Sequence, residues 1–263
     1  MPFSMKHKCL FVHIPRNAGS SFREALGIRL PNNHTPPQEL NGDFEYRSKD
    51  ESKLPIFLQL HHLCMKHIQM LEVLEFSLFT DSLKVAFVRN PWDKVVSAYS
   101  HYYHKVSVDF EDYIIKVEKI VSFINENFVF DLENIFYKQY SDLMISTLKL
   151  SGPGRFGLNL SINEIALNTY LWVDPHFLPQ HLFIYDEFDN QLVDCVGRFE
   201  NYEKDAEDIL NHLGILPNSA SQMSKPHLNS SIHENYRDVY NLKTRDIVYN
   251  LFKKDIQTFD YTF

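Results

Sequence analysis

Residues 9–23, CLFVHIPRNAGSSFR, join what we expect to be a buried strand to a helix. Residues 9–14 form an apolar run of strand length, which is typical of a strand covered on both faces. Pro15 ends this run, a cation follows at Arg16, and small residues lead into a helix that we expect to begin near Ser20. A cation and small residues where a strand passes into a helix predict a binding site for an anion.

The length and composition of the chain indicate one globular domain. The 263 residues are 44% hydrophobic and 23% charged, so we expect a single domain over residues 1–263 with one large core. No apolar stretch is long enough for a transmembrane helix. Pro15 interrupts the first apolar run too early for a signal peptide, and we therefore expect a cytoplasmic protein.

The cysteines and the net charge exclude several classes of site. Cys9, Cys64 and Cys195 are far apart, odd in number and without CxxC spacing. They predict buried thiols in a reducing compartment rather than a disulfide frame or a zinc site, and we expect no metal cofactor. The net charge of -8 argues against general nucleic-acid binding, so an anion site must be built locally from a few cations and backbone N–H groups.

The order of apolar segments predicts the fold class. We expect a second buried strand at 84–88 and further strands at 181–186 and 191–197, separated by a short turn. Helices are expected over 60–74, from Pro91 with Asn90 as its N-cap, over much of 109–150, over 201–215, and once or twice over 230–256. Strands that alternate with helices predict an α/β fold, with a mainly parallel central sheet flanked by helices in a P-loop-like architecture.

The first strand-to-helix junction carries groups that suit a phosphate. Ligands of parallel sheets lie at the carboxyl ends of strands, where Ala18 and Gly19 allow the backbone to approach an anion closely. Ser20 and Ser21 add hydroxyl donors. A tight turn capped by serine is the alternative interpretation, and the GxxxxGK[ST] pattern of a Walker loop is absent from the chain.

The second junction lies in VAFVRNPWDKVVSAY, residues 85–99. Arg89 directly follows the predicted strand, and Ser97 lies about 9 Å along the next helix from Pro91. A group that lies alongside this helix would therefore contact both side chains. The alternative is that Arg89 pairs with Asp93 while Ser97 only packs.

Together the two junctions resemble those of sulfotransferases that use 3′-phosphoadenosine 5′-phosphosulfate (PAPS). FVHIPRNAGSS resembles the 5′-phosphosulfate loop of that family, and FVRNPWDKVVSAYSHY resembles its 3′-phosphate motif. The sequences of the two motifs most resemble those of the branch that contains Golgi carbohydrate sulfotransferases and their bacterial relatives. Weaker similarity continues through DPHFLPQ, VGRFENYEKD, KPHLNSS and the final DIQTFDYTF, whereas residues 30–60 and 105–165 match no motif of the family.

The resemblance implies a donor, an acceptor class and a set of contacts. The donor is PAPS, its product is 3′-phosphoadenosine 5′-phosphate (PAP), and the acceptor is a hydroxyl group, with a carbohydrate preferred. The implied 5′-phosphosulfate contacts are Arg16, Asn17, Ala18, Gly19, Ser20 and Ser21, and the implied 3′-phosphate contacts are Arg89 and Ser97. The family usually has lysine at position 16. Arginine keeps the charge there but does not readily give up a proton, so the implied role of Arg16 is electrostatic.

An acceptor hydroxyl needs a base, and the pKa of histidine suits that role. The chain has 13 histidines, so the resemblance selects among them. His62 lies in HHLCM, which resembles the histidine-bearing segment of carbohydrate sulfotransferases; His61 and His176 are the further candidates. An inert pair at a helix terminus is the alternative for His61 and His62. His13 lies inside the predicted first strand and is interpreted as structural.

Two other functions remain open from the sequence. A non-catalytic PAP- or PAPS-binding protein is one, because Arg16 replaces the usual lysine. A nucleotide-dependent kinase of similar fold is less favoured, because the Walker lysine is absent and no aspartate at the end of either strand is placed to hold magnesium.

Overall fold

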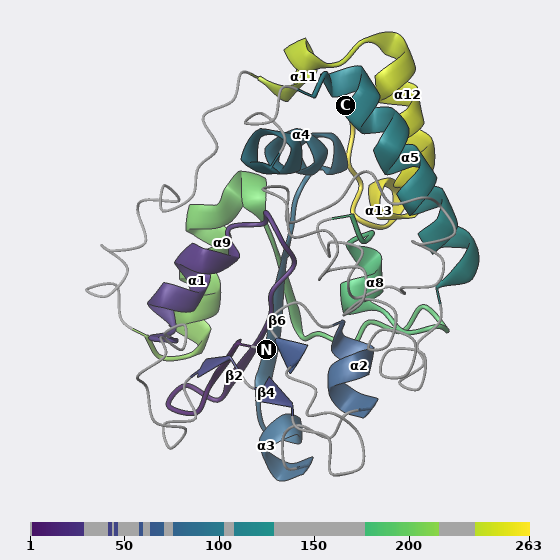
Figure 1. The fold of residues 1–263 in the computed structure, drawn as a ribbon. Helices are drawn as coiled ribbons and strands as arrows, with labels where there is room; N and C mark the ends of the chain where they lie inside the picture. The colour runs from purple at the N-terminus through teal and green to yellow at the C-terminus, as the bar shows by residue number, and fades with distance from the viewer. Residues whose placement is uncertain are drawn as a thin grey trace. The chain divides into compact units, whose positions relative to one another are not determined.

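The computed structural model describes residues 2–28, 42–43, 45–46, 58–59, 64–70, 76–102, 108–128, 177–215 and 235–263 (Figure 1). The chain divides into two compact units, and we describe each by itself. Unit 1 comprises Met1–Arg89 and Leu182–Ser230, and unit 2 comprises Asn90–His181 and Ser231–Phe263. The single domain expected over residues 1–263 stays a prediction.

Unit 1 contains a five-stranded sheet with the order β3-β1-β2-β6-β7. Its strands are β1 (Pro2–Ser4), β2 (Cys9–Val12), β3 (Gly42–Asp43), β6 (Leu83–Val88) and β7 (Cys195–Arg198). The neighbours β2–β6 and β6–β7 are parallel, whereas β1 is antiparallel to both β2 and β3. The α/β fold with a parallel centre is therefore confirmed. A separate antiparallel pair joins β4 (Glu45–Tyr46) to β5 (Leu58–Gln59).

Aromatic side chains form the core on one face of this sheet. The helices α1 (Gly19–Ala25) and α9 (Tyr202–His212) contribute to the same buried cluster as β2 and β6. Phe22 lies between two strand residues, with ring centroids 5.1 Å from Phe11 and 5.0 Å from Phe87. Gly197 of β7 is required here, because a Cβ on it would lie 2.4 Å from the Phe87 ring. The apolar runs predicted as buried strands are buried because helices cover them.

The expected strand at 181–186 is wrong. Residues His181–Ile184 form the short helix α8, and only Tyr185 makes an isolated antiparallel bridge to Gln191. The turn between Tyr185 and Gln191 is tight, because the Asp186 carboxylate accepts hydrogen bonds from the backbone N–H groups of Phe188 and Asn190. The hydrophobic periodicity of a short apolar run does not distinguish a strand from a helix, and this run is helical. The strand expected at 191–197 begins only at Cys195.

The remaining α-helices in the described part of unit 1 are short. They are α2 (Met65–Met70), within the expected helix at 60–74, and α3 (Phe76–Thr80), directly ahead of the strand β6. Among the described residues no helix is long and apolar enough to cross a bilayer.

Unit 2 is helical in its described parts. Its helices are α4 (Pro91–Tyr102), α5 (Phe110–Asn127), α11 (Tyr236–Val239), α12 (Leu242–Leu251) and α13 (Lys253–Thr258). The start of α4 is as predicted, since the Asn90 side chain accepts the Trp92 backbone N–H at 3.1 Å. One or two helices were expected over 230–256; the described residues from 235 onward contain three, α11, α12 and α13.

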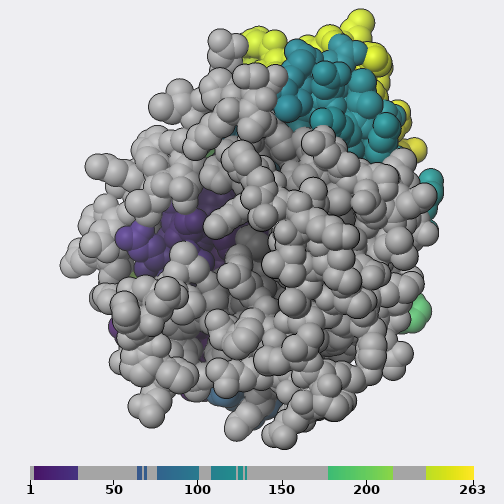
Figure 2. Space-filling model, viewed as in Figure 1, coloured from purple at the N-terminus to yellow at the C-terminus, as the bar shows by residue number. Residues whose placement is uncertain are grey.

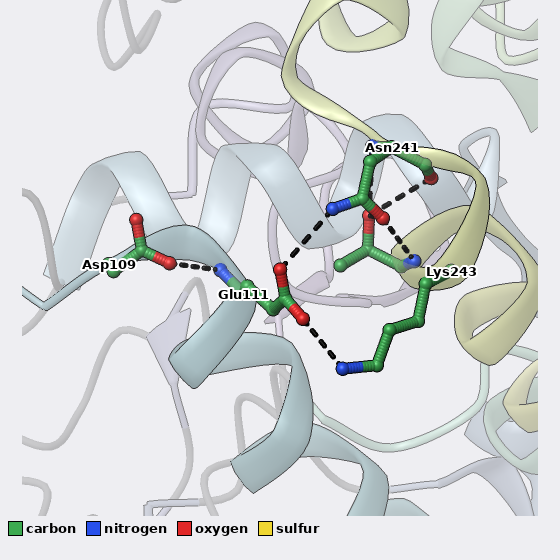
Figure 3. Close-up of polar contacts among 5 residues, drawn as sticks. Asp109, Glu111, Asn241 and Lys243 are labelled. Carbon is green, nitrogen blue, oxygen red and sulfur yellow. Dashed lines mark hydrogen bonds and ion pairs between the residues drawn. The ribbon is translucent and has the colours of Figure 1, made fainter.

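Polar contacts tie the ends of these helices together (Figure 3). The Asp109 carboxylate caps α5 by accepting the Glu111 N–H at 2.8 Å. The Glu111 side chain in turn accepts from Lys243 at 2.6 Å and from Asn241 at 3.3 Å, both at the start of α12. Asn241 and Thr244 form a capping box on α12. These contacts fix where α5 and α12 begin relative to one another within unit 2.

Candidate anion site

Arg16 and Arg89, the arginines of the two junctions, lie together in unit 1. Arg16 lies in the loop between β2 and α1, and Arg89 is the first residue after β6. Because β2 and β6 are parallel neighbours, their carboxyl ends meet at one edge of the sheet. The Arg89 Nη1 donates a hydrogen bond to the Arg16 carbonyl oxygen at 2.9 Å. The structure therefore brings together the two arginines that were predicted to bind one anionic ligand.

The backbone of the loop over residues 16–18 has unusual dihedral angles. Arg16 has φ of 67° and Ala18 has φ of 60°, so both lie in the left-handed region, whereas Asn17 between them does not. Left-handed residues of this kind occur in the concave nests of backbone N–H groups that bind anions. Each non-glycine residue in this region carries strain of about 1–3 kcal/mol, so the surrounding structure must hold the loop in place.

Asn17 supplies one of the contacts that hold this loop. Its side chain is 1% exposed, and its Nδ2 donates to the Phe87 carbonyl oxygen at 2.8 Å. Together with the bond from Arg89 to Arg16, this gives two links from the loop to the end of β6. The sequence comparison implied that Asn17 contacts the 5′-phosphosulfate; the structure shows that its side-chain amide binds the neighbouring strand.

Gly19 opens α1 with no room for a side chain. A Cβ at this position would lie 2.0 Å from His13 Cδ2 and 2.2 Å from His13 Nε2. The His13 ring is itself stacked on Phe11, with centroids 5.7 Å apart and planes inclined by 22°. His13, interpreted from the sequence as structural, therefore packs directly under the start of the helix, and Gly19 is needed because of it.

The two serines that follow lie in the first turn of α1. Ser20 is half-buried and Ser21 is buried, and the Ser21 N–H donates to the Ala18 carbonyl at 3.1 Å. Among the described residues no side chain caps α1, whose N-cap is Ala18. The alternative of a serine-capped turn is therefore not what the structure shows.

Atoms of the N-terminal segment, purple in Figure 2, reach the surface on the face drawn there.

Arg89 lies in a buried environment that includes an aromatic ring. Its side chain is 6% exposed, and its guanidinium carbon lies 3.9 Å from the centroid of Phe199. Phe199 begins the 3₁₀ helix η3 (Phe199–Asn201), directly after β7. Phe199 lies within VGRFENYEKD, and the resemblance implied no role for this residue. The available signal was its position after a third parallel strand, which places it at the same edge of the sheet.

Several predicted residues are not tested by this geometry. Ser97 lies in α4 of unit 2 and is fully buried, and its role as a 3′-phosphate contact stays a prediction. His61, His62 and His176 lie outside the described residues, so their assignment as candidate bases also stays a prediction.

The three cysteines and the metal-binding side chains of the described residues form no further site. Cys9 and Cys64 are buried and Cys195 is partly buried, and all three are free thiols. Burial raises the pKa of Cys9 to about 12 and raises that of Cys64 as well, so these thiols stay protonated near neutral pH. Within the described ranges, no group of three or more metal-binding side chains occurs.

Comparison with known proteins gives one match. The model of a family described as the sulfotransferase family matches residues 2–262, a range that includes both junctions and Phe199. Searches of curated proteins and of solved structures found no match.

Proposed function

The chain belongs to the sulfotransferase family, and we propose that it transfers a sulfuryl group from PAPS to a hydroxyl group of a carbohydrate or glycoconjugate. The family match over residues 2–262 establishes sulfuryl transfer as its general chemistry. PAPS as the donor is supported by the arrangement of the two junctions. The carbohydrate acceptor is supported by the resemblance of both motifs to the carbohydrate branch of the family.

One observation carries the proposal for the donor, namely the hydrogen bond from Arg89 to the carbonyl oxygen of Arg16. PAPS is anionic at its 5′-phosphosulfate and again at its 3′-phosphate. A ligand with two anionic ends suits two cationic segments that lie side by side at the edge of one sheet. In the proposal, residues 16–21 bind the 5′ end through backbone N–H groups, the Arg16 charge and serine hydroxyls, while Arg89 and Ser97 bind the 3′-phosphate.

The residues present fit the electrostatic demands of the reaction. The acceptor oxygen forms a bond to sulfur while the bond from sulfur to the phosphate oxygen breaks, and negative charge develops on that oxygen. Donors that are already oriented toward this charge lower the barrier without having to reorganise. Hydrogen bonds of Asn17 and Arg89 hold the loop over residues 16–18 against the end of β6, so its backbone N–H groups have a fixed arrangement before the ligand arrives.

In the proposal, charge stabilisation and proton transfer belong to different residues. Arg16 stabilises the departing phosphate as an anion and gives it no proton, because arginine does not readily donate one. The proton of the acceptor hydroxyl passes to a histidine, for which His62 is preferred over His176 and His61. This assignment rests on the resemblance of HHLCM and DPHFLPQ to the family.

A transfer assay tests the proposal. Purified chain is incubated with ³⁵S-labelled PAPS and a panel of carbohydrates, and we expect label on at least one acceptor. His62→Ala is expected to reduce turnover at least about a hundredfold with unchanged PAP affinity. His212→Ala, which alters an exposed histidine at the end of α9, is the matched control.

Ligand binding separates the proposal from its two rivals. PAP is expected to raise the melting temperature, and ATP with magnesium is not. Stabilisation by ATP with magnesium would support the kinase instead. PAP binding without transfer to any acceptor would support a non-catalytic binding protein, the reading that Arg16 in place of lysine keeps open.

A further inference from the structure

We propose that Phe199 is a positioning residue that orients the Arg89 guanidinium and thereby sets the preference of the site for nucleotides with a 3′-phosphate. The inference rests on the proposed function, in which Arg89 binds that phosphate. It concerns a residue to which the sequence motifs assigned no role.

The register of the sheet places the two residues next to each other. Val88 on β6 pairs with Arg198 on β7 in a parallel ladder. Arg89 and Phe199 are the residues that follow this pair, so both leave the sheet at the same edge. The contact between the guanidinium and the ring, at 3.9 Å, is therefore a consequence of strand pairing rather than of a flexible loop.

The segment that carries Phe199 is itself anchored. The Arg198 backbone N–H donates to the Asp205 carboxylate at 2.7 Å, which ties the start of η3 to the first turns of α9. On the strand side, the Phe87 ring fills the space over Gly197. These contacts fix the backbone on both sides of Phe199, and the ring is presented to Arg89 from a constrained position.

Two contacts of different kinds then define the orientation of Arg89. The N–H groups of a guanidinium lie in one plane, so the orientation of that plane determines where every donor points. The Arg16 carbonyl oxygen accepts from one edge of the group, and the Phe199 ring covers its face. Without the ring, the guanidinium keeps its bond to the Arg16 carbonyl oxygen but loses one of the contacts that fix its plane, so its donors are less firmly directed to one place.

A simple packing role for Phe199 predicts a different result. Loss of packing would loosen the end of the sheet and weaken any nucleotide that binds there, with or without a 3′-phosphate. Loss of positioning would weaken chiefly nucleotides that carry the 3′-phosphate, because the guanidinium keeps its bond to the Arg16 carbonyl oxygen and the 3′-phosphate is the ligand group assigned to Arg89. The ratio of the affinities for PAP and for 5′-AMP therefore separates the two roles.

The experiment measures both dissociation constants by calorimetry for the native chain and three variants. Phe199→Leu keeps an apolar side chain but removes the aromatic face, and Phe199→Tyr keeps the face. Phe188→Leu is the matched control, because Phe188 lies in the turn of unit 1 and is 76% exposed. We expect Phe199→Leu to weaken PAP about tenfold and 5′-AMP less than about twofold. The other two variants should match the native chain.

A double variant tests whether Phe199 acts on the 3′-phosphate through Arg89. In an Arg89→Lys background, Phe199→Leu should leave the PAP to 5′-AMP ratio unchanged, because lysine has no plane to orient. Phe199→Met replaces Phe199→Leu if the latter does not fold.

If Phe199→Leu leaves the ratio of the PAP and 5′-AMP affinities unchanged, whether or not both affinities fall, the inference is overturned while the proposed function stands. A native chain that binds neither nucleotide would instead contradict the proposed function, and this inference with it.

Discussion

Gly19 lies so close to the His13 imidazole that position 19 has no room for a side chain. A Cβ at position 19 would lie 2.0 Å from the imidazole, so Gly19→Ala has to displace either the ring or the loop. We expect this substitution to weaken PAP binding about tenfold, because overpacking of this kind typically costs about 1–3 kcal/mol. Calorimetric titration with PAP measures the loss.

The double variant His13→Ala/Gly19→Ala is the control for that prediction. Removal of the imidazole makes room for the new methyl group, so the double variant should bind PAP better than Gly19→Ala alone. Native affinity in Gly19→Ala would show that the close contact does not position the loop.

Tyr202 buries a hydroxyl group in the core of unit 1. The residue is 4% exposed, and no described residue accepts from or donates to its hydroxyl. Burial also raises the pKa of Tyr202 above its ordinary value. A buried hydroxyl without a partner is unfavourable, so Tyr202→Phe should increase the free energy of unfolding by about 1 kcal/mol. Urea denaturation measures this change.

Tyr185→Phe provides the comparison. Its hydroxyl donates to Gln191 at 3.1 Å on the surface, so its removal should leave stability unchanged or slightly lower it. A Tyr202→Phe variant less stable than the native chain would show that the hydroxyl is satisfied after all.

At the scale of elements, α5 depends on its N-cap. The Asp109 side chain accepts the Glu111 N–H, and the carboxylate also lies at the positive end of the helix dipole (Figure 3). Asp109→Ala should lower the free energy of unfolding by about 1 kcal/mol, as measured by urea denaturation. Asp112→Ala, an exposed residue in the same first turn, is the control and should change stability much less. Equal effects of the two would mean that charge, not capping, stabilises the helix.

The elements that the sequence predicted well are those with strong local signals. The strands β2 and β6 are apolar runs, and α4 begins with a cap at Asn90 and a proline at its first position. The strand-to-helix junctions could be located for the same reason. Their proximity followed from the rule that the ends of parallel strands share one edge.

The features that the sequence did not predict depend on distant contacts. The N–H groups of residues 180 and 181 bind the Asp255 carboxylate, so α8 is stabilised by a residue far along the chain. Phe199 reaches Arg89 only because β7 pairs with β6 in a particular register. Arg16 and Ala18 have left-handed backbone angles although neither is glycine, so the sequence does not indicate this conformation. Hydrogen bonds between the loop and the end of β6 hold it in place.

At the scale of the whole molecule, stability in acid is expected to depend on one buried carboxylate in unit 2. Asp255 is fully buried, and its Oδ1 lies 2.6 Å from His181 Nδ1. Burial alone would raise the pKa of Asp255, but hydrogen bonds from His181 and from two backbone N–H groups outweigh it, and the pKa is lowered. The folded state therefore favours the ionised form. This stabilisation is present above the ordinary carboxyl pKa of about 3.9 and is lost as the pH falls through the lower pKa of the folded state.

Asp255→Asn tests this account of acid stability. At pH 7 it should lower the free energy of unfolding by about 3 kcal/mol, because it leaves the partners of a buried charge unsatisfied. Below about pH 4 the difference from the native chain should shrink. Urea denaturation from pH 7 to pH 2 measures both, and Asp260→Asn is the exposed control. A constant difference across this range would contradict the assignment.

The central claim is that one bis-phosphorylated adenosine binds at the linked junctions of Arg16 and Arg89, and a crystal structure of the chain with PAP tests it most directly. The account predicts the 5′-phosphate against the backbone N–H groups of residues 16–21 and the 3′-phosphate within hydrogen-bonding distance of the Arg89 guanidinium. A nucleotide bound elsewhere, or one that contacts the loop while its 3′-phosphate points away from Arg89, would contradict it.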